Sequence, residues 1–130
     1  MRPIDLVSKF IATMNDNDIE AAMNMLSEDV FYHNVPRDPV RGRAAALGVC
    51  RQYGIGERLR PDWEVLNIAE SNETVLTERI DRFVTREGRT ASVRLMGAFR
   101  VRNDEIIEWR DYYDSIEAHR EFSGIQEAVA

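Results

Sequence analysis

The sequence is poor in the residues that mark disulfide-bonded, metal-binding and membrane-spanning proteins. It contains one cysteine, Cys50, so no disulfide can form within the chain, and only two histidines, His33 and His119. A zinc site would need both histidines together with carboxylates, so we expect no metal. The longest uncharged apolar run, 44–50, is far shorter than the ~20 residues that a membrane-spanning helix needs. We therefore expect no membrane span.

Lysine is almost absent. Lys9 is the only lysine among seventeen basic residues, and twenty-three acidic residues leave a net charge of −6. An acidic chain of this kind does not fit nucleic acid or an anionic membrane surface as its main partner. Charges within the first ten residues also interrupt the apolar core that a signal peptide needs. We therefore expect a cytoplasmic protein that binds neither nucleic acid nor a membrane.

Two common catalytic motifs are also missing. No Gly-x-Ser-x-Gly sequence occurs, which excludes a serine nucleophile on a strand-to-helix elbow. The closely spaced glycines Gly54 and Gly56 follow a predicted helix instead of opening one, so they do not form a phosphate-binding loop. We expect no cofactor.

The chain has the size and composition of one globular domain. It has 130 residues, of which 44% are hydrophobic and 31% are charged. We expect residues 1–130 to form a single domain with one core.

Three helices are predicted in the first part of the chain. Apolar residues recur every three or four positions between Ile4 and Met14, and residues 15–17 end that stretch. Asp18 has the character of an N-cap for a second helix. The residues that this helix would turn inward are Ala21, Ala22, Met25 and Leu26. A third helix is predicted over residues 44–53, ended by glycines.

Strands are predicted for the rest of the chain. Residues 30–35 form a short β-type run that Pro36 ends. Four longer strands, separated by tight turns, are predicted over residues 63–69, 74–85, 90–101 and 105–113. Helices followed by hairpin-connected strands indicate an α+β fold, with helices on one side of a sheet. If such a sheet curves into a cup, a small ligand would bind on its concave face.

Alternation along the strands places polar side chains beside apolar ones. One face of the strand around residue 80 carries Val75, Thr77, Arg79, Asp81 and Phe83. In the last strand, the odd-numbered face, which Trp109 favours as the inner one, carries Ile107, Trp109, Asp111 and Tyr113. In the first strand, Tyr32 and Asn34 share a face, with His33 opposite.

A charged pair in the middle of a strand is the most unusual feature. Arg-x-Asp occurs three times in the sequence, but only Arg79-Ile-Asp81 lies mid-strand. A buried pair would be costly unless its members satisfied each other. The alternative is that the opposite face of this strand is buried and that the pair lies in water.

Three segments carry a combination of polar and aromatic residues: Phe31-Tyr-His-Asn-Val-Pro36, Thr77-Glu-Arg-Ile-Asp-Arg-Phe83 and Trp109-Arg-Asp-Tyr-Tyr-Asp114. In this order and spacing they resemble the limonene-1,2-epoxide hydrolases. That family belongs to the cup-shaped α+β proteins that include nuclear transport factor 2, ketosteroid isomerase and polyketide cyclases. The resemblance implies a strongly curved mixed sheet that forms a cone, three to four helices packed on it, and a homodimer through the outer face of the sheet.

The resemblance also implies roles for particular residues. Asp81 matches the family's general acid, Asp111 its general base, and Arg79 the arginine that bridges them. Tyr32 and Asn34 match the residues that hold the attacking water. Strand parity adds, as apolar walls of the pocket, Phe83, Val93, Leu95 and Tyr113.

The chemistry that this set implies is epoxide hydrolysis by paired carboxyl groups. Water must lose a proton to an ionised carboxylate while the ring oxygen gains one from a protonated carboxyl. The implied reaction converts a small apolar epoxide, terpene-like or derived from a cycloalkene, to a vicinal diol in one step. Alternatives on the same fold are an isomerase, a polyketide-cyclase-like enzyme, or a non-catalytic domain that binds a small ligand. The chain ends soon after Gly124, which leaves open whether a C-terminal segment closes the pocket.

Overall fold

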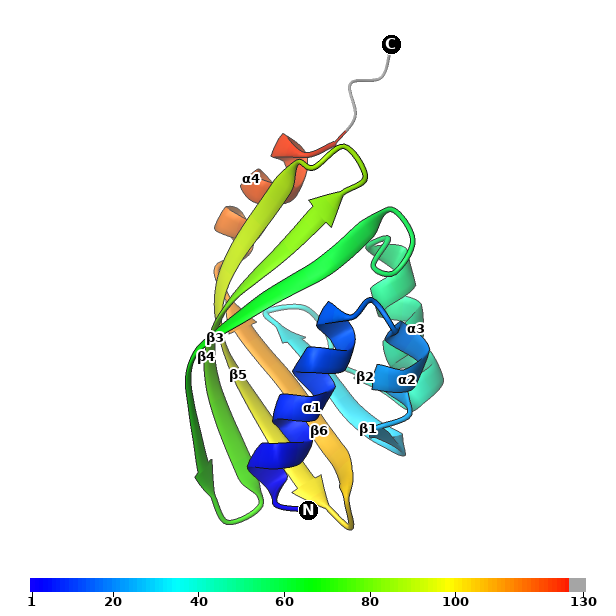
Figure 1. Ribbon diagram of the computed structural model, residues 1–130, viewed down its shortest axis with the longest axis vertical. Helices are drawn as coiled ribbons and strands as arrows, with labels where there is room; N and C mark the ends of the chain where they lie inside the picture. Colours follow the sequence, from blue (N-terminus) through cyan, green and yellow to red (C-terminus); the bar gives the residue numbers. More distant parts are fainter. Residues whose placement is uncertain (127–130) are drawn as a thin grey trace.

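Over residues 1–126, the part of the chain that it describes, the computed structural model forms one mixed six-stranded sheet with helices packed on it (Figure 1). The strand order is β2-β1-β6-β5-β4-β3; β1 and β6 are parallel, and all other neighbours are antiparallel. The strands are β1 (Leu26–Val35), β2 (Val40–Arg41), β3 (Leu59–Ser71), β4 (Thr74–Thr85), β5 (Thr90–Arg102) and β6 (Glu105–Tyr113). The helices are α1 (Pro3–Asn15), α2 (Ile19–Met23), α3 (Arg43–Gln52) and α4 (Ser115–Gly124). The α+β fold is confirmed.

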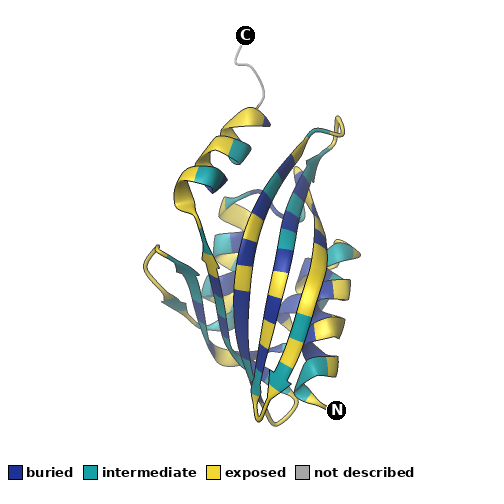
Figure 2. Ribbon diagram, turned by 90° about the vertical axis from the view of Figure 1, so that its left-hand side faces the viewer, coloured by how far each residue is buried: buried dark blue, intermediate teal, exposed yellow. Residues whose placement is uncertain are grey.

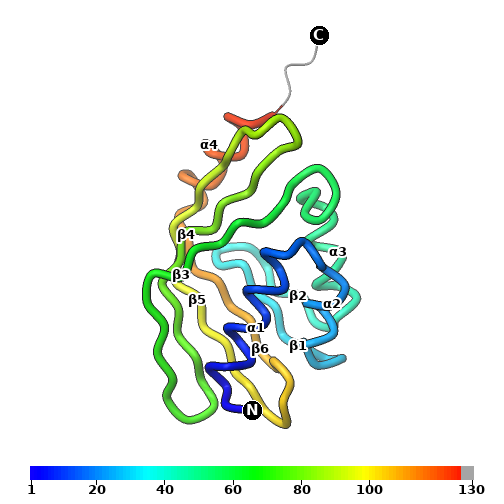
Figure 3. The backbone as a smooth tube through the Cα atoms, in the orientation of Figure 1, coloured from blue at the N-terminus to red at the C-terminus, as the bar shows by residue number. Residues whose placement is uncertain are grey.

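Helix α1 packs across the inner face of the sheet and closes the core (Figure 3). Pro3 lies in its first turn, where a missing N–H costs no helical hydrogen bond. Its predicted apolar stripe is buried, and Phe10 meets the rings of Phe99 and Trp109 edge-on, with centroids 6.0 and 5.0 Å away. The aromatic core therefore lies directly beside the middle of β5 and β6.

The second helix is shorter than the sequence predicts. Asp18 caps it as expected, its side chain accepting a hydrogen bond from the N–H of Ala21, but the helix ends at Met23. Leu26, predicted inside the helix, instead begins β1 and pairs with Ile106 of β6. The prediction for Met25 and Leu26 was wrong because strand pairing outweighs the local helical pattern.

The four long strands and their turns agree with the predicted hairpins, with two differences. Strand β3 begins at Leu59 and continues through Pro61, which is tolerated because β3 is an edge strand. In β6, Ile106 is buried instead of Ile107. An irregularity in the pairing of β5 with β6, between Arg100 and Val101, shifts the alternation at this point.

Helix α4, which was not predicted, continues where β6 stops. The pairing of β6 with β5 ends at Tyr113, and Asp114 then caps α4 through the N–H groups of the helix's first turn. Glu121 accepts a hydrogen bond from the N–H of Ser92 in the part of β5 that β6 leaves open. The helix thus borders the part of the sheet that lies at the top of Figure 1. None of the helices within residues 1–126 is long and apolar enough to cross a membrane.

The outer face of the sheet is turned away from α1, α2 and α3 (Figure 2). Buried and exposed residues alternate along its long strands, as the two-residue period of a strand requires. The inner side chains of β4, β5 and β6 face the helices and the core.

Candidate active site

The charged pair of β4 lies inside the protein. Arg79 and Asp81 are 1% and 2% exposed, and Asp111 on β6 is 4% exposed. The face of β4 that carries Arg79 is therefore the buried one, which the family resemblance implies and which alternation alone left open. The alternative, in which the pair lies in water, is wrong.

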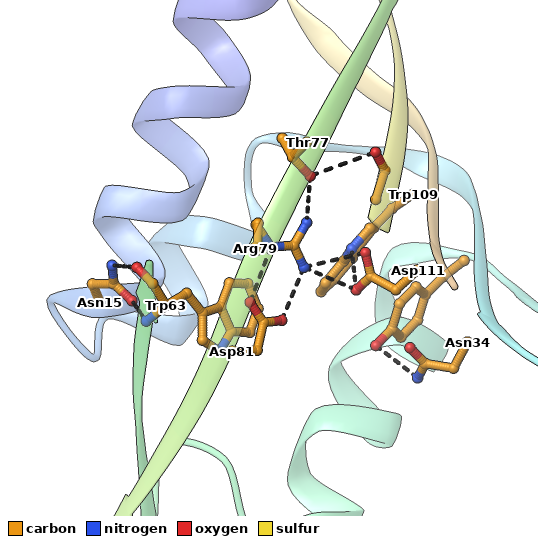
Figure 4. A network of polar contacts seen from close by, with 10 residues as sticks. Asn15, Asn34, Trp63, Thr77, Arg79, Asp81, Trp109 and Asp111 are labelled. Carbon is orange, nitrogen blue, oxygen red and sulfur yellow. Dashed lines mark hydrogen bonds and ion pairs between the residues drawn. The ribbon is translucent and has the colours of Figure 1, made fainter. Parts of the chain in front are cut away.

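Arg79 joins both carboxylates (Figure 4). Its Nε and Nη2 donate to the two oxygens of Asp81 at 3.0 and 2.9 Å. The same Nη2 lies 3.2 Å from each oxygen of Asp111, and Nη1 donates to Oγ1 of Thr77 at 3.0 Å. All three nitrogens of the guanidinium are therefore hydrogen-bonded to protein, which is the condition for burying such a charge.

Gly97 makes this arrangement possible. It lies on β5 between Thr77 and Asp111, its partners on the two neighbouring strands. A Cβ at this position would lie 2.8 Å from both Oδ1 of Asp111 and Oγ1 of Thr77, and closer still to Nη1 of Arg79. The guanidinium reaches from β4 to β6 only because residue 97 has no side chain.

Aromatic rings surround the ionic group. The guanidinium carbon of Arg79 lies 5.2 Å from the ring centroid of Trp63 and 5.7 Å from that of Phe99, within the range of cation–π attraction. Trp109 donates from Nε1 to Oδ2 of Asp111 at 3.1 Å. The rings of Trp63 and Phe99 shield the Arg79 guanidinium, and the hydrogen bond from Trp109 orients the Asp111 carboxylate.

Tyr32 and Asn34 lie beside Asp111 because β1 pairs in parallel with β6. In this register, Asn34 is opposite Asp111 and Tyr32 is opposite Trp109, on which its ring stacks at 4.1 Å. Asn34 donates from Nδ2 to the Tyr32 hydroxyl at 2.9 Å. The hydroxyl proton of Tyr32 remains available for another acceptor. His33 points the other way, as predicted, and its Nε2 lies 2.7 Å from the carbonyl oxygen of Arg37.

Burial makes both carboxyl groups easier to protonate. It raises the pKa of Asp81, and Arg79 only partly opposes this. Burial also raises the pKa of Asp111 to about 6; Arg79 opposes the rise, the charge of Asp81 adds to it, and the Trp109 hydrogen bond reduces it. Burial alone would lower the pKa of Arg79, but the two carboxylates raise it. The guanidinium thus stays charged while its partners can take up a proton.

A cavity of about 710 Å³ opens onto these carboxylates. Asp81, Asp111, Tyr32 and Asn34 all line it. Of the predicted apolar walls, the lining includes Phe83, Leu95 and Tyr113. Val93 is buried but is absent from the lining found among residues 1–126, although it pairs with Asp81 across the strands. Strand parity gave the inner face of Val93 correctly but could not give its distance from the cavity.

Helix α4 forms one wall of this cavity. Its Ala118 and Phe122 line it, as does Ile125 just beyond the helix. Phe122 packs against Phe83, with ring centroids 5.2 Å apart. The segment after β6 therefore borders the cavity. The sequence alone had left open whether this segment closes the pocket.

Cys50 also lines the cavity but has no nucleophilic character. Burial raises its pKa to about 12, so the thiol stays protonated at neutral pH. Within residues 1–126, no group of three histidine, cysteine or carboxylate side chains is placed to hold a metal ion.

Sequence reasoning missed four contributors to the site. Thr77 and Trp109 were placed on inner faces but given no role, and both hydrogen-bond the ionic group. Gly97 carried a usable signal, since a glycine within a strand often marks a close approach by another group. Helix α4 gave no strong signal because its apolar face is narrow, with Ala118 as its one buried residue.

Comparisons with known proteins find relatives of this chain. The family model of the limonene-1,2-epoxide hydrolase catalytic domain matches residues 1–123. Epoxide hydrolase EphG of Mycobacterium tuberculosis is 30% identical over 109 residues, which are 83% of this chain and 70% of that protein.

Solved structures show the same fold. An M. tuberculosis epoxide hydrolase that resembles the limonene-1,2-epoxide hydrolases superposes with a TM-score of 0.80 and 24% identity, over 94% of this chain and 90% of that one. A nuclear transport factor 2-like protein of unknown function from Burkholderia pseudomallei superposes with a TM-score of 0.78 and 17% identity, over 95% and 98%. The cup-shaped fold expected from the sequence is confirmed.

Proposed function

We propose that this chain, which belongs to the limonene-1,2-epoxide hydrolase family, hydrolyses an epoxide to a vicinal diol without a cofactor. The observation that carries the proposal is the pair of buried carboxyl groups, Asp81 and Asp111, held by one arginine at the end of a cavity. Isomerases and cyclases that work with a single base have no need of an arginine that joins two carboxyl groups.

In the proposed mechanism Asp111 is the base and Asp81 the acid. Tyr32 and Asn34 hydrogen-bond a water molecule and aim it together with Asp111, which removes a proton as the water attacks one epoxide carbon. Asp81 gives its proton to the ring oxygen as the C–O bond breaks. The diol keeps the water oxygen and one of its protons, and the attacked carbon is inverted. Asp111 holds the other water proton and Asp81 is left ionised, so a proton must return from Asp111 to Asp81 to restore the resting enzyme.

This mechanism requires one proton on the carboxyl pair. Burial, the largest influence on both groups, keeps that proton within reach of neutral pH, although the two-nitrogen contact from Arg79 favours the ionised form of Asp81. We expect activity to fall as the pH drops through about 6, where Asp111 takes up a proton. We expect a second fall at the pH at which the carboxyl pair loses its one remaining proton.

We also propose a substrate class, an oligomeric state and a cellular location. The apolar walls of Phe83 and Leu95 suit a small, mostly apolar epoxide of the terpene or cycloalkene kind. Exposed apolar side chains on the outer face of the sheet, such as Leu76 and Met96, suit a homodimer through that face. A cytoplasmic location, where a single reduced cysteine is usual, is also proposed.

A labelling experiment tests the mechanism. A small panel of cyclic epoxides is incubated with the enzyme in ¹⁸O-labelled water under single-turnover conditions. Label in the first-turnover diol supports direct attack by water, whereas an unlabelled diol would mean a covalent ester intermediate.

Two isosteric variants test the roles. Asp111→Asn and Asp81→Asn are each expected to lose at least about a thousandfold in kcat/KM while remaining folded, since each lacks one of the two proton transfers. Near wild-type turnover in either variant would show that the assigned residue is wrong.

A further inference from the structure

The mouth of the cavity, which we define by Arg37, Arg58 and Arg86, carries more positive than negative charge. Arg37, Arg58 and Arg86 line the same cavity as the two catalytic carboxyl groups. Asp81 and Asp111 form the floor of the cavity. Apart from them, Glu87 is the one acidic residue found in the lining among residues 1–126, and it lies 3.7 Å from Arg89. In a chain of net charge −6, a local excess of positive charge at a cavity is unusual.

These three arginines also differ from most others in the protein. Ten of the sixteen arginines form an ion pair with a carboxylate of residues 1–126, and the examples include Arg94 with Glu117 and Arg102 with Glu73. Within residues 1–126, no carboxylate lies within ion-pair distance of the three at the mouth. Within that range, no ion pair neutralises their charges.

Each of the three arginines makes a contact in the segment that joins α3 to β3, although they come from different parts of the chain. Arg37 lies over the ring of Tyr53, 5.3 Å from its centroid. Arg58 packs on Gly54, where a Cβ would lie 2.7 Å from Cγ of Arg58. Arg86 donates from Nη2 to the carbonyl oxygen of Glu57 at 3.5 Å. Each group has further N–H donors that these contacts do not use.

The floor of the cavity has the opposite character. Its one cation, Arg79, has all its nitrogens bonded to Asp81, Asp111 and Thr77, and the groups that it presents to the cavity are carboxyl oxygens. An anionic group on a ligand would be repelled there and attracted at the mouth. Between the two ends lie the apolar walls of Phe83 and Leu95. The cavity therefore has an acid–base end, an apolar middle and a cationic end.

We propose that the substrate is an amphipathic epoxide that carries a carboxylate at the end remote from the epoxide ring, and that Arg37, Arg58 and Arg86 bind this carboxylate. The inference rests on the proposed function of the floor. Guanidinium groups bind carboxylates through paired, charge-assisted hydrogen bonds, so the mouth would orient the substrate with its epoxide toward Asp81 and Asp111. The carboxylate itself takes no part in the reaction. A cavity of about 710 Å³ has room for such an extended molecule.

A binding experiment tests this independently of catalysis. Trp63 and Trp109 both line the cavity, so tryptophan fluorescence reports its occupation. We expect octanoate to bind at least about tenfold more tightly than the neutral octanamide at low ionic strength, with a ratio that falls as salt is added. In the triple variant Arg37→Gln, Arg58→Gln, Arg86→Gln, the ratio should fall to about one. The matched control is Arg60→Gln, an exposed arginine outside the cavity lining, which should keep the wild-type ratio.

Equal binding of the two probes by the wild type, or a preference that survives in the triple variant, would overturn the inference. An equal fall of the octanoate-to-octanamide affinity ratio in Arg60→Gln would also overturn it, because the preference would then come from overall charge. If the triple variant does not fold, each single variant is measured, and each should reduce the ratio by about threefold.

An activity measurement separates this inference from the proposed function. A cyclohexene epoxide with a carboxylate on a short alkyl chain is compared with its methyl ester. Turnover of both at equal kcat/KM would contradict the carboxylate inference and leave epoxide hydrolysis standing. No turnover of either, with octanoate still preferred in the binding experiment, would contradict epoxide hydrolysis and leave carboxylate binding standing.

Discussion

Each face of the central strands carries side chains that are unusual there: buried charges on the inner face and exposed apolar groups on the outer face. On the inner face Arg79, Asp81 and Asp111 are at most 4% exposed, whereas on the outer face of the same strands Met96 and Tyr112 are 52% and 44% exposed. These two outer residues are neighbours across the strands, since Met96 pairs with Tyr112. Charge is thus buried and apolar surface is exposed within a single sheet.

This arrangement indicates where function lies. Buried charges and exposed apolar patches are each costly or unusual in a monomeric protein, so each calls for a specific reason. On the inner face the reason is a hydrogen-bonded acid–base pair beside a cavity. On the outer face the proposed reason is a second copy of the chain. Changing one face at a time separates the two explanations.

After replacement of the two carboxyl groups themselves, the largest effect on the inner face is expected from Gly97→Ala. The added Cβ would lie 2.8 Å from Asp111 and Thr77 and would push the Arg79 guanidinium away from Asp111. We expect a loss of at least about a hundredfold in kcat/KM, because misplacing a catalytic group by about 1 Å costs that much. The unfolding free energy should fall by about 1–3 kcal/mol, as for other overpacked sites.

Gly48→Ala is the matched control for this variant. Gly48 lies in α3, and a Cβ there would meet nothing within 4 Å. This variant should keep full activity and gain up to about 1 kcal/mol of stability. If Gly97→Ala behaved in the same way, the close approach at residue 97 would not matter to the site.

The second effect is a pH-dependent gain in stability for Asp111→Asn. The folded-state pKa of Asp111, about 6, is above its ordinary value of 3.8, so the wild type loses stability as the pH rises from about 4 through about 6. The variant lacks this titration. Its unfolding free energy relative to the wild type should therefore rise over this range, by up to about 3 kcal/mol.

Urea unfolding at pH 4.5 and pH 8 measures this difference. The exposed Asp38→Asn serves as control and should follow the wild type at both pH values. A relative stability of Asp111→Asn that falls between pH 4.5 and pH 8 would show that Arg79 favours the ionised Asp111 more than burial disfavours it.

The sequence predicted which side chains share a face of a strand better than it predicted the contacts between strands. Alternation placed Arg79 and Asp81 together on β4 because a strand has a strict two-residue period. It failed at Ile106 and Ile107, since the shift in pairing between β5 and β6 depends on both strands and leaves no pattern in either. The contact of Arg79 with Asp111 bridges β5, so its geometry depends on register and on Gly97. The mouth of the cavity could not be predicted, because its arginines meet only through the tertiary fold.

The third effect is expected from Thr77→Val, again on the inner face. Valine has nearly the shape of threonine but leaves Nη1 of Arg79 without its acceptor inside the protein. An unsatisfied buried donor costs about 1–3 kcal/mol of unfolding free energy. We expect a fall of that size together with about a tenfold loss in kcat, measured by thermal unfolding and by steady-state assay. Thr77→Ser keeps the hydroxyl and should retain most of the activity, which a role in packing alone would not explain.

The smallest effect on the folded chain is expected from Met96→Lys on the outer face. Met96 is 52% exposed and its side chain lies opposite to the ionic group, so the variant should keep kcat and remain within about 0.5 kcal/mol of the wild type in the stability of each subunit. If a homodimer forms through this face, a charge at its centre should weaken association by at least about tenfold, as measured by sedimentation at several concentrations. Lys9, on the exposed side of α1, offers a control at Lys9→Met, which adds an apolar side chain without touching the sheet. Unchanged association in Met96→Lys would remove the outer face as the dimer interface and leave its exposed apolar residues without a partner in a second copy.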